Sequence, residues 1–451
     1  MQIQASTLKG TRDYHPEQVV RRRYIFDTIR GVFELYGFRP LETPAMEKLE
    51  TLTGKYGEEG DRLIFKVLNN GDFLAKVPDE ILQQRDYRAM IPWIARRALR
   101  YDLTVPFARY VVQHRHQLQF PFKRYQIQPV WRADRPQKGR YQEFYQCDAD
   151  VVGPISSASE AELIEIYAEV FHQLQLDVRI RINNRKILEG IAEIAQVQDR
   201  WQEMTIAIDK LDKIGTEGVR HELSNKGFTS QQIETIFDLL LTEDIHILAE
   251  KLKVSAIGGQ GVEELRALLP YFDEQRLPPN AVFDFTLARG LNYYTGFIVE
   301  VVPTGVQLGS IGGGGRYDDL TGVFGLPNLP GVGISFGAER IYDALETLGL
   351  FPNHLQWDIS VLLLSMDAAS LEHAFHLARQ LRRHRIPVDI YPQVAKFKKQ
   401  MKYANQRKVP YVLIIGEDER NQQRYTLKNM ATGEQQSLAL DELIDFFNAH
   451  S

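Results

Sequence analysis

The sequence predicts an α+β fold: an antiparallel sheet with flanking helices, a helical insertion, and a separate C-terminal α/β domain. Strand-like runs at 281–287, 297–302 and 331–336 show broken alternation and glycine-rich turns, which is typical of antiparallel sheets. From 184 to 272 the pattern is mainly helical, and beyond 357 strands alternate with helices. A chain of 451 residues is long enough for two or three such domains.

The composition is that of an ordinary globular protein. Hydrophobic residues make up 44% of the chain and charged residues 25%. Because the formal net charge is −5, any site for a polyanion must be a local patch. Cys147 is the only cysteine, which excludes an intrachain disulfide and a cysteine-cluster zinc site. We find no signal peptide and no apolar run of ~20 residues, so we expect a cytoplasmic protein that does not contact a membrane.

Local patterns predict the first elements of the chain. Apolar residues recur at helical spacing within 17–36, which predicts an amphipathic helix that Gly37 ends. Asn70-Gly71 predicts a hairpin between two short strands. A further helix is expected over 156–175, with acidic residues in its first turn.

The most informative segment, 122–153, reads as a strand, a basic loop and a second strand. Because side chains alternate along a strand, one face of the second strand carries Phe144, Gln146, Asp148 and Asp150. A face so polar is costly to bury unless something binds there, although a solvent-exposed strand face would carry the same pattern.

Two further segments combine unusual residues. LRYDLTVPFARY, at 99–110, places Asp102 and Thr104 on one expected strand face. GVGISFGAERI, at 331–341, reads as a strand of small residues that enters a helix carrying Arg340.

The last unusual segment is LARGLNYYTG, at 287–296, which carries Arg289 and two adjacent tyrosines. Neighbouring residues on a strand point in opposite directions, so at most one of Tyr293 and Tyr294 should reach a ligand, and we favour Tyr294. The glycines at 312–315 lack the features of a phosphate-binding loop, and we expect a tight turn near the site.

These four segments, in this order, resemble the histidyl-tRNA synthetase family of class II aminoacyl-tRNA synthetases. LRYDLTVPFAR, WRADRPQKGRYQEFYQ and ARGLNYYTG are similar to the signature stretches of that family. Residues 20–48, with Pro44, resemble motif 1, which builds the dimer interface in the family, so the resemblance implies a homodimer. Residues 122–152 resemble motif 2, and 331–341 resemble motif 3.

The resemblance spans essentially the whole chain and implies its organisation. A class II synthetase catalytic core would comprise 1–183 and 276–349, with the helical insertion at 184–275. A linker at 350–357 would lead to an anticodon-binding domain at 358–451. The implied substrates are L-histidine, ATP with Mg²⁺, and tRNA(His), and no metal-ligand set of the protein itself is expected.

The resemblance also implies residues that act on ATP. Adenylate formation brings a carboxylate against the α-phosphate, so fixed cations must offset the charge, and arginine suits this role. Arg132 and Arg289 would hold the α-phosphate from two sides, and Arg340 would hold the γ-phosphate. Phe144 would stack on the adenine, and Asp134 would contact its edge.

A second set of residues would bind histidine. By resemblance these are Asp102, Thr104, Gln146, Asp150, Arg289, Tyr293 and Tyr294. The first three would accept from the ammonium group, while Asp150 and Tyr294 would contact the imidazole. A pocket that satisfies both ring nitrogens can reject apolar side chains by roughly 10⁴–10⁵ without editing. Many bacterial relatives carry a glutamate where Asp102 stands, so the shorter side chain requires a closer backbone or a bridging water.

Two basic segments are assigned to tRNA by the same resemblance. The residues expected at the acceptor end, in the motif 2 loop, are Gln137, Lys138 and Arg140. Those expected in the anticodon-binding domain are Lys396, Lys398 and Lys399, in a stretch without acidic residues over 396–408. A charge run taken alone is usually a solvated face.

The main alternative is a non-catalytic, histidine-sensing regulatory subunit of ATP phosphoribosyltransferase, which is a synthetase-like paralogue. Such paralogues lack the anticodon-binding domain, whereas residues 358–451 are present here. A synthetase-like domain of a kinase regulator would need kinase signatures, and the sequence shows none.

Overall fold

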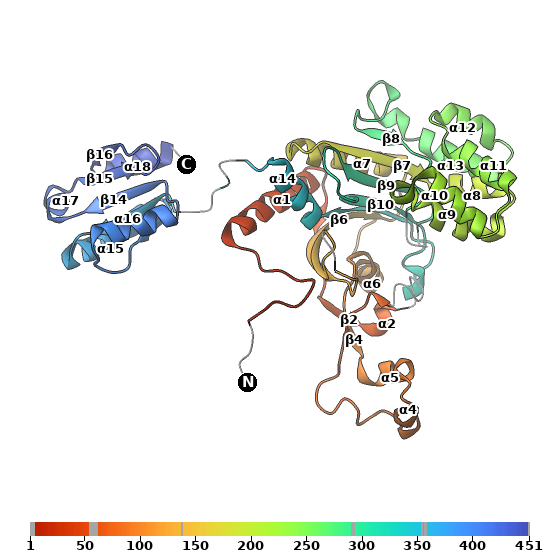
Figure 1. Ribbon diagram of the computed structural model, residues 1–451, viewed down its shortest axis with the longest axis horizontal. Coiled ribbons are helices and arrows are strands. Elements are labelled where there is room, and N and C mark those ends of the chain that lie inside the picture. Colours follow the sequence, from red (N-terminus) through yellow and green to blue (C-terminus); the bar gives the residue numbers. More distant parts are fainter. Residues whose placement is uncertain are drawn as a thin grey trace. The chain divides into compact units, whose positions relative to one another are not determined.

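The computed structural model describes residues 5–53, 62–136, 139–289, 294–352, 355 and 359–449. The chain forms two compact units, Met1–Pro352 and Asn353–Ser451, and each has buried cores of its own (Figure 1). None of the helices in these ranges is both long and apolar enough to cross a membrane.

An eight-stranded sheet forms the centre of the first unit, in the order β1-β5-β6-β11-β10-β9-β7-β8. Its strands are β1 (Arg39–Pro40), β5 (Phe122–Trp131), β6 (Glu143–Val152), β7 (Val178–Asn184), β8 (Ala281–Phe283), β9 (Phe297–Pro303), β10 (Gly312–Tyr317) and β11 (Gly331–Gly337). The six strands from β5 to β7 in this order pair antiparallel, which confirms the predicted sheet. The edge strands β1 and β8 differ, because each pairs parallel with its neighbour.

Helices cover the apolar face of this sheet. They are α1 (Pro16–Leu35), α7 (Ser157–Gln173) and α14 (Ala338–Leu348). Their buried side chains, such as Ile29 and Phe171, share one core with Cys147 and Ala149 of β6. The helices expected within 17–36 and 156–175 are confirmed, and Gly37, at φ 77°, follows α1 in the left-handed conformation that favours glycine.

A small three-stranded sheet lies beside α6 (Thr104–His114) and carries an arm of short helices. Its elements are β2 (Met46–Lys48), β3 (Lys66–Val67), β4 (Arg97–Leu99), α2 (Leu49–Leu52), α4 (Asp79–Gln84) and α5 (Tyr87–Ile94). The predicted hairpin at Asn70-Gly71 is wrong, because β3 pairs with β4 instead of with a strand after the turn. The Asn70 side chain accepts from Arg97 Nη2 at 3.1 Å, so it supports this long-range pairing.

The helical segment of the first unit lies beside β7 in Figure 1. Its helices are α8 (Arg185–Ile194), α9 (Trp201–Ile208), α10 (Leu211–Asn225), α11 (Ser230–Leu240), α12 (Ile245–Leu252) and α13 (Ala256–Arg266). Helices α8 and α13 touch at small residues, since a Cβ on Gly190 would lie 2.4 Å from Gly258 Cα.

The second unit has a five-stranded sheet in the order β13-β12-β14-β15-β16. Its strands are β12 (Val361–Ser365), β13 (Val388–Ile390), β14 (Tyr411–Ile415), β15 (Tyr425–Asn429) and β16 (Gln435–Leu438), and its helices are α15 (Ala368–Arg383), α16 (Phe397–Gln406), α17 (Glu417–Gln422) and α18 (Leu440–Ala449). On α16, buried Gln400 bonds the backbone of Ser365, while Lys398 and Lys399 are exposed. The predicted basic helix is therefore present, with these lysines on its outer side.

Candidate active site

The two faces of β6 differ as alternation predicts. The side chains in the hydrophobic core are those of Cys147, Ala149 and Val151. On the other face, Asp148 and Asp150 are only 2% and 3% exposed. A solvent-exposed strand face is therefore excluded, and the polar face is buried against other parts of the chain.

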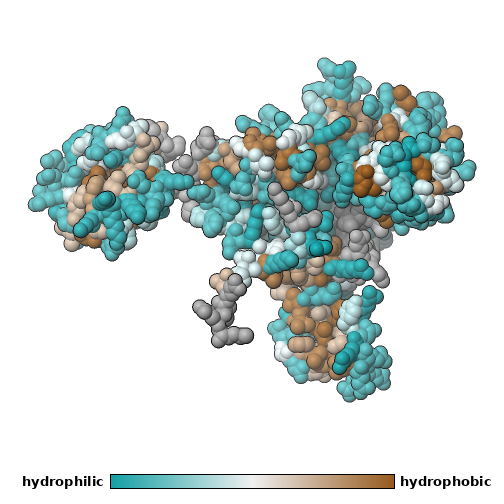
Figure 2. Space-filling model, viewed as in Figure 1, coloured by the Kyte–Doolittle hydropathy of each residue, from teal (hydrophilic) through white to brown (hydrophobic). Residues whose placement is uncertain are grey.

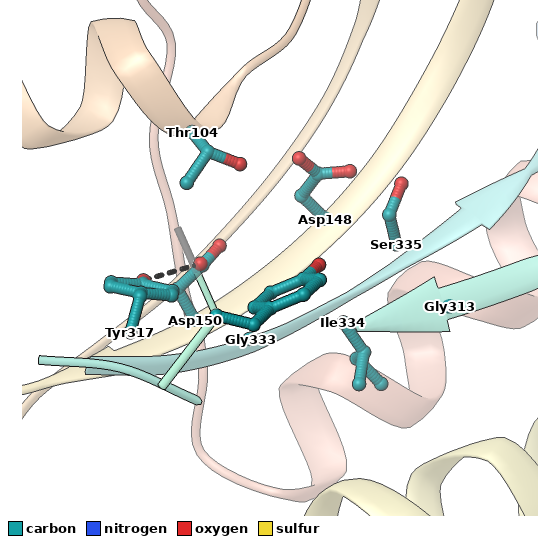
Figure 3. Close-up of a pocket in the computed structure, with 9 residues that line it drawn as sticks. Thr104, Asp148, Asp150, Gly313, Tyr317, Gly333, Ile334 and Ser335 are labelled. Carbon is teal, nitrogen blue, oxygen red and sulfur yellow. Dashed lines mark hydrogen bonds between the residues drawn. The ribbon is translucent and has the colours of Figure 1, made fainter. Parts of the chain in front are cut away.

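A cavity lies over this polar face (Figure 3). It is lined by Thr104, Asp148, Asp150, Tyr294, Gly313, Tyr317, Gly333, Ile334 and Ser335. These residues come from five parts of the chain, namely α6, β6, β10, β11 and the segment before β9, which the fold brings together. The cavity is almost entirely polar along β6 and offers several hydrogen-bond acceptors to a small ligand.

Asp150 is tightly held at one end of the cavity. The Tyr317 hydroxyl donates to Asp150 Oδ1 at 2.6 Å, as Figure 3 shows, and Arg124 Nη2 lies 2.7 Å from Oδ2. Arg124 is fully buried, with its guanidinium 4.2 Å from the centre of the Phe107 ring. Burial raises the pKa of Asp150, although Arg124 and Tyr317 act in the opposite direction.

Asp148 lacks so close a cationic partner. Its pKa is raised to about 7, mainly by burial; Asp150 and Asp102 add to the rise, while Arg124 and a hydrogen bond with Ser335 oppose it. In the folded protein, this carboxyl group therefore holds a proton over a pH range in which the unfolded chain has lost it. Because the folded-state pKa is raised, the free energy of unfolding falls as the pH rises toward 7.

We expect Asp148→Asn to stabilise the ligand-free protein increasingly at higher pH. Its advantage over the unmodified chain should grow by about 2 kcal/mol between pH 5.5 and pH 8.5, because the amide never has to ionise in a buried place. Urea unfolding of both proteins at the two pH values measures the difference. An advantage that is the same at both pH values would mean that Asp148 does not carry this proton.

The expectation that Asp102 and Thr104 share a strand face is wrong, because β4 ends at Leu99 and Thr104 is the first residue of α6. Asp102 Oδ1 accepts from the Val105 amide at 3.2 Å, so its side chain caps the helix. Pro106 in the first helical turn agrees with this start and was the signal in the sequence. Thr104 still lines the cavity, and Asp102 is 5% exposed.

The three predicted arginines lie in one neighbourhood. Burial lowers the pKa of Arg340, and three nearby guanidinium groups lower it further: those of Arg289, Arg140 and Arg132. Repulsion among these cations indicates a site that an anion would neutralise.

Backbone and side-chain contacts hold two of these arginines around Ser310. Arg340 donates to the Ser310 carbonyl at 2.6 Å, and Arg289 donates to the Ser310 hydroxyl. Arg340 Nε also donates to the Gly139 carbonyl at 3.0 Å, which ties the loop between β5 and β6 to α14.

Glu300 of β9 positions Arg289. Its Oε1 accepts from Arg289 Nη1 at 2.8 Å, and its Oε2 accepts from Arg181 at 3.2 Å. Arg181 in turn donates to Asp212 of α10 at 2.6 Å. A chain of charged contacts therefore joins Arg289 to the helical segment.

The residues predicted for adenine lie near Arg132. The Arg132 guanidinium is 5.1 Å from the centre of the Phe144 ring, and its Nη2 lies 3.4 Å from Gln146 Oε1. Asp134 Oδ2 is 4.0 Å from Arg140 Nε. Phe144 and Gln146 thus run toward Asp148 along one face of β6, in the predicted order.

The glycines at 312–315 form no turn, so that prediction is also wrong. They belong to β10, in the middle of the sheet. A Cβ on Gly313 would lie 2.7 Å from Arg289 Nη1, and one on Gly315 would lie 2.8 Å from the Tyr294 ring. Glycine is required here because side chains of the site pack directly against the strand and leave no room for a Cβ. Glycine within a strand often marks such a close approach.

Some predicted residues are not placed beside the cavity. Tyr293, Gln137 and Lys138 lie outside the described residues. Lys396, Lys398 and Lys399 belong to the second unit, which is described by itself.

Several residues in or beside the cavity were not among the predicted site residues. These are Arg124, Asp148, Tyr317, Gly333 and Ser335. Alternation along the strand places Asp148 on the polar face, so its position beside the site could have been predicted from the sequence. The role of Gly333 could also have been suspected from the run of small residues on its strand. A Cβ at this position would lie 2.1 Å from Asp150 Oδ1, so only glycine fits.

Comparison with known protein families identifies two parts of the chain. A family model described as histidyl-tRNA synthetase matches residues 95–341. A second, described as an anticodon binding domain, matches residues 358–450. The first match alone covers more than half of the chain and includes all four segments that line the cavity.

Similar proteins extend the likeness to nearly the full length. A histidine–tRNA ligase of Christiangramia forsetii is 52% identical over 443 residues, which cover 96% of this chain and 97% of that protein. One from Porphyromonas gingivalis is 51% identical over 438 residues, 96% of each chain. The crystal structure of histidyl-tRNA synthetase from Nostoc sp. PCC 7120 is similar with a TM-score of 0.83, at 31% identity and over 100% of both chains.

Proposed function

Because the chain belongs to the histidyl-tRNA synthetase family, we propose that the cavity over β6 is where it activates histidine with ATP. The protein is a histidine–tRNA ligase: it uses ATP to charge tRNA with histidine. Residues 1–183 and 276–349 are proposed as the catalytic core, 184–275 as its helical insertion, 350–357 as the linker and 358–451 as the anticodon-binding domain.

Three arginines are proposed to hold ATP. Arg132 and Arg289 bind the α-phosphate from two sides and offset the charge that builds up when the histidine carboxylate attacks. Arg340 binds the γ-phosphate and keeps the pyrophosphate in line. The observation that carries this proposal is their mutual closeness: Arg289 and Arg340 both donate to Ser310, and Arg132 lies near enough to lower the pKa of Arg340.

The adenine and the metal complete the nucleotide site. Phe144 stacks on the adenine, and Asp134 contacts its edge. Mg²⁺ enters with ATP as part of the substrate, ligated mainly by phosphate oxygens.

Histidine is proposed to lie along the polar face of β6. Its ammonium group is near Asp102, Thr104 and Gln146, and its carboxylate points toward Arg289. Asp150 and Tyr294 contact the imidazole at the other end, and Tyr293 remains a further proposed contact. Support comes from the order of these side chains along one strand face and from the burial of Asp150.

The second unit is proposed to bind the anticodon end of tRNA(His) through Lys396, Lys398 and Lys399. Gln137, Lys138 and Arg140 are proposed to meet the acceptor end. The exposure of these three lysines, at the start of α16, supports the first assignment, because phosphate contacts need accessible cations.

Replacing Lys398 and Lys399 together by Ala should separate the two half-reactions. We expect kcat/KM for tRNA charging to fall by about 10-fold or more, and its salt dependence to weaken by roughly one unit per lost phosphate contact. Histidine-dependent ATP–pyrophosphate exchange should stay unchanged. The matched control replaces the exposed Arg379 and Arg383 of α15 by Ala. Equal losses in both double variants would contradict a specific role for α16.

A homodimer is proposed from the resemblance of residues 20–48 to a dimer-forming motif. The surface nearby supports it: Figure 2 shows hydrophobic patches on the arm, where Leu68 and Trp93 are 49% and 38% exposed. Met46 of β2 is 49% exposed as well. Sedimentation equilibrium tests this proposal and should give twice the mass of one chain.

We also propose a cytoplasmic location, where the tRNA and ATP substrates are used.

The direct test of the function is ATP–pyrophosphate exchange by the purified protein with each standard amino acid in turn. We expect exchange with histidine alone, followed by charging of tRNA(His). A histidine-sensing regulatory subunit would bind histidine without exchange. The anticodon-binding domain match at 358–450 argues against that alternative.

A further inference from the structure

Asp148 presents a carboxylate to the cavity that the assignments above leave without a role. In Figure 3 it lies between Thr104 and Ser335, and the hydrogen bond drawn there joins Tyr317 to Asp150 instead. The Ser335 hydroxyl hydrogen-bonds its carboxyl group, and Gln146 Nε2 lies 3.5 Å from Oδ1, which is the outer limit of a hydrogen bond. A carboxylate has about four acceptor positions, so Asp148 retains capacity for a ligand.

Asp150 has less capacity left, because two of its acceptor positions are occupied and the others serve the proposed contact with the imidazole. Its two oxygens already face the Tyr317 hydroxyl at 2.6 Å and the Arg124 guanidinium at 2.7 Å. Of the two buried carboxylates on this face, Asp148 is therefore the better placed to accept from a new donor.

Gln146 is also partly committed. Its Nε2 donates to Ser335 Oγ at 3.0 Å, and its Oε1 lies 3.4 Å from Arg132 Nη2. The amide thus turns its donors toward Asp148 and Ser335 and its acceptor toward Arg132. An ammonium group in the cavity needs acceptors, and Gln146 offers it only the remaining acceptor position of Oε1.

The charges around Asp148 favour a cation. Acidic groups face it from β6 (Asp150) and from the segment before α6 (Asp102). The buried guanidinium of Arg124, on β5, is paired with Asp150, and that of Arg100 bonds the carbonyls of Thr43, Pro44 and Pro129. The phenols near the cavity are those of Tyr294 and Tyr317. Asp148 therefore has two other carboxylates among its neighbours, whereas Arg124 and Arg100 are engaged with other partners.

We propose that Asp148 is a further histidine-binding residue, whose carboxylate accepts a hydrogen bond from the α-ammonium group of the substrate. Asp148 lies one pleat from Gln146 and one from Asp150, between the proposed sites for the ammonium group and for the imidazole. The inference rests on the proposed binding of histidine in this cavity. On binding, the ammonium ion takes the place of the proton that Asp148 holds in the free protein, and that proton leaves to solvent.

Asp148→Asn should weaken histidine binding by roughly 10- to 100-fold, the usual effect of losing a hydrogen bond to a charged group. The ligand provides the matched control. 3-(Imidazol-4-yl)propionate has the ring and the carboxylate of histidine but no ammonium group. Its affinity should be the same for both proteins within about two-fold, which also shows that the variant keeps a folded cavity.

Isothermal titration of the full chain with both ligands, at pH 7 in two buffers of different ionisation enthalpy, measures affinity and proton release together. The unmodified protein should release up to about half a proton more than Asp148→Asn when histidine binds, and subtraction cancels the ionisation of the ligand itself. Equal weakening of both ligands, unchanged histidine affinity, or equal proton release would each overturn the proposal. If the unmodified protein binds the propionate but not histidine, or neither ligand, the assignment of the cavity to histidine itself fails.

Discussion

Arg289→Ala is expected to lower histidine-dependent adenylate formation by at least 10². The guanidinium stabilises charge that develops on the α-phosphate only in the transition state, and removing one such donor typically costs this much. Its position depends on the contacts of Nη1 with Glu300 and with the carbonyl of Gly312, at 2.8 and 3.2 Å. The kcat/KM of ATP–pyrophosphate exchange measures the effect.

A matched control for this variant is Arg179→Ala. Arg179 is an exposed cation on β7. This strand pairs with β9, which carries Glu300, so the control lies in the same part of the sheet. It should leave exchange unchanged. Arg289→Lys keeps the charge but loses the fork of donors, so we expect it to recover only part of the activity. Near-normal exchange by Arg289→Ala, with the fold intact by circular dichroism, would contradict its role.

Asp150→Asn should destabilise the protein by about 3–5 kcal/mol, because it leaves the buried Arg124 guanidinium without a counter-charge. The Tyr317 hydroxyl at 2.6 Å is a neutral partner and cannot replace the lost anion. The free energy of unfolding from urea titration measures the loss. Histidine activation should fall too, since Asp150 is the proposed contact for the imidazole.

Two further variants isolate the cause. Asp148→Asn is the same chemical change two residues away on the same face, and it should not destabilise, since the pKa of about 7 shows that burial disfavours its charge. Arg124→Met combined with Asp150→Asn removes the unpaired cation and should recover part of the lost stability. A stability of Asp150→Asn equal to that of the unmodified chain would show that the ion pair contributes nothing.

Alternation and spacing predicted the parts of the site that lie on one regular element. The polar face of β6 follows from side-chain direction alone, and so does the exposed lysine face of α16. The helical segment was also readable, because six helices follow one another without an intervening strand between Asn184 and Ala281. Local geometry decides these features, so the sequence carries them directly.

The errors come from contacts between distant segments. The glycines of β10 looked like a turn, but Arg289 and Tyr294 press against that strand and exclude larger side chains. Asp102 looked like a strand residue, but its carboxylate caps α6. No role was predicted for Arg124 on β5, because only the fold places it against Asp150. A single sequence does not reveal such partners before the strand order is known.

A crystal structure of the protein with histidine and a non-hydrolysable ATP analogue tests the proposed active site most directly. We expect Arg132 and Arg289 at the α-phosphate, Arg340 at the γ-phosphate, and the imidazole beside Asp150 and Tyr294. A nucleotide bound away from these three arginines, or a histidine ring outside the cavity over β6, would contradict it.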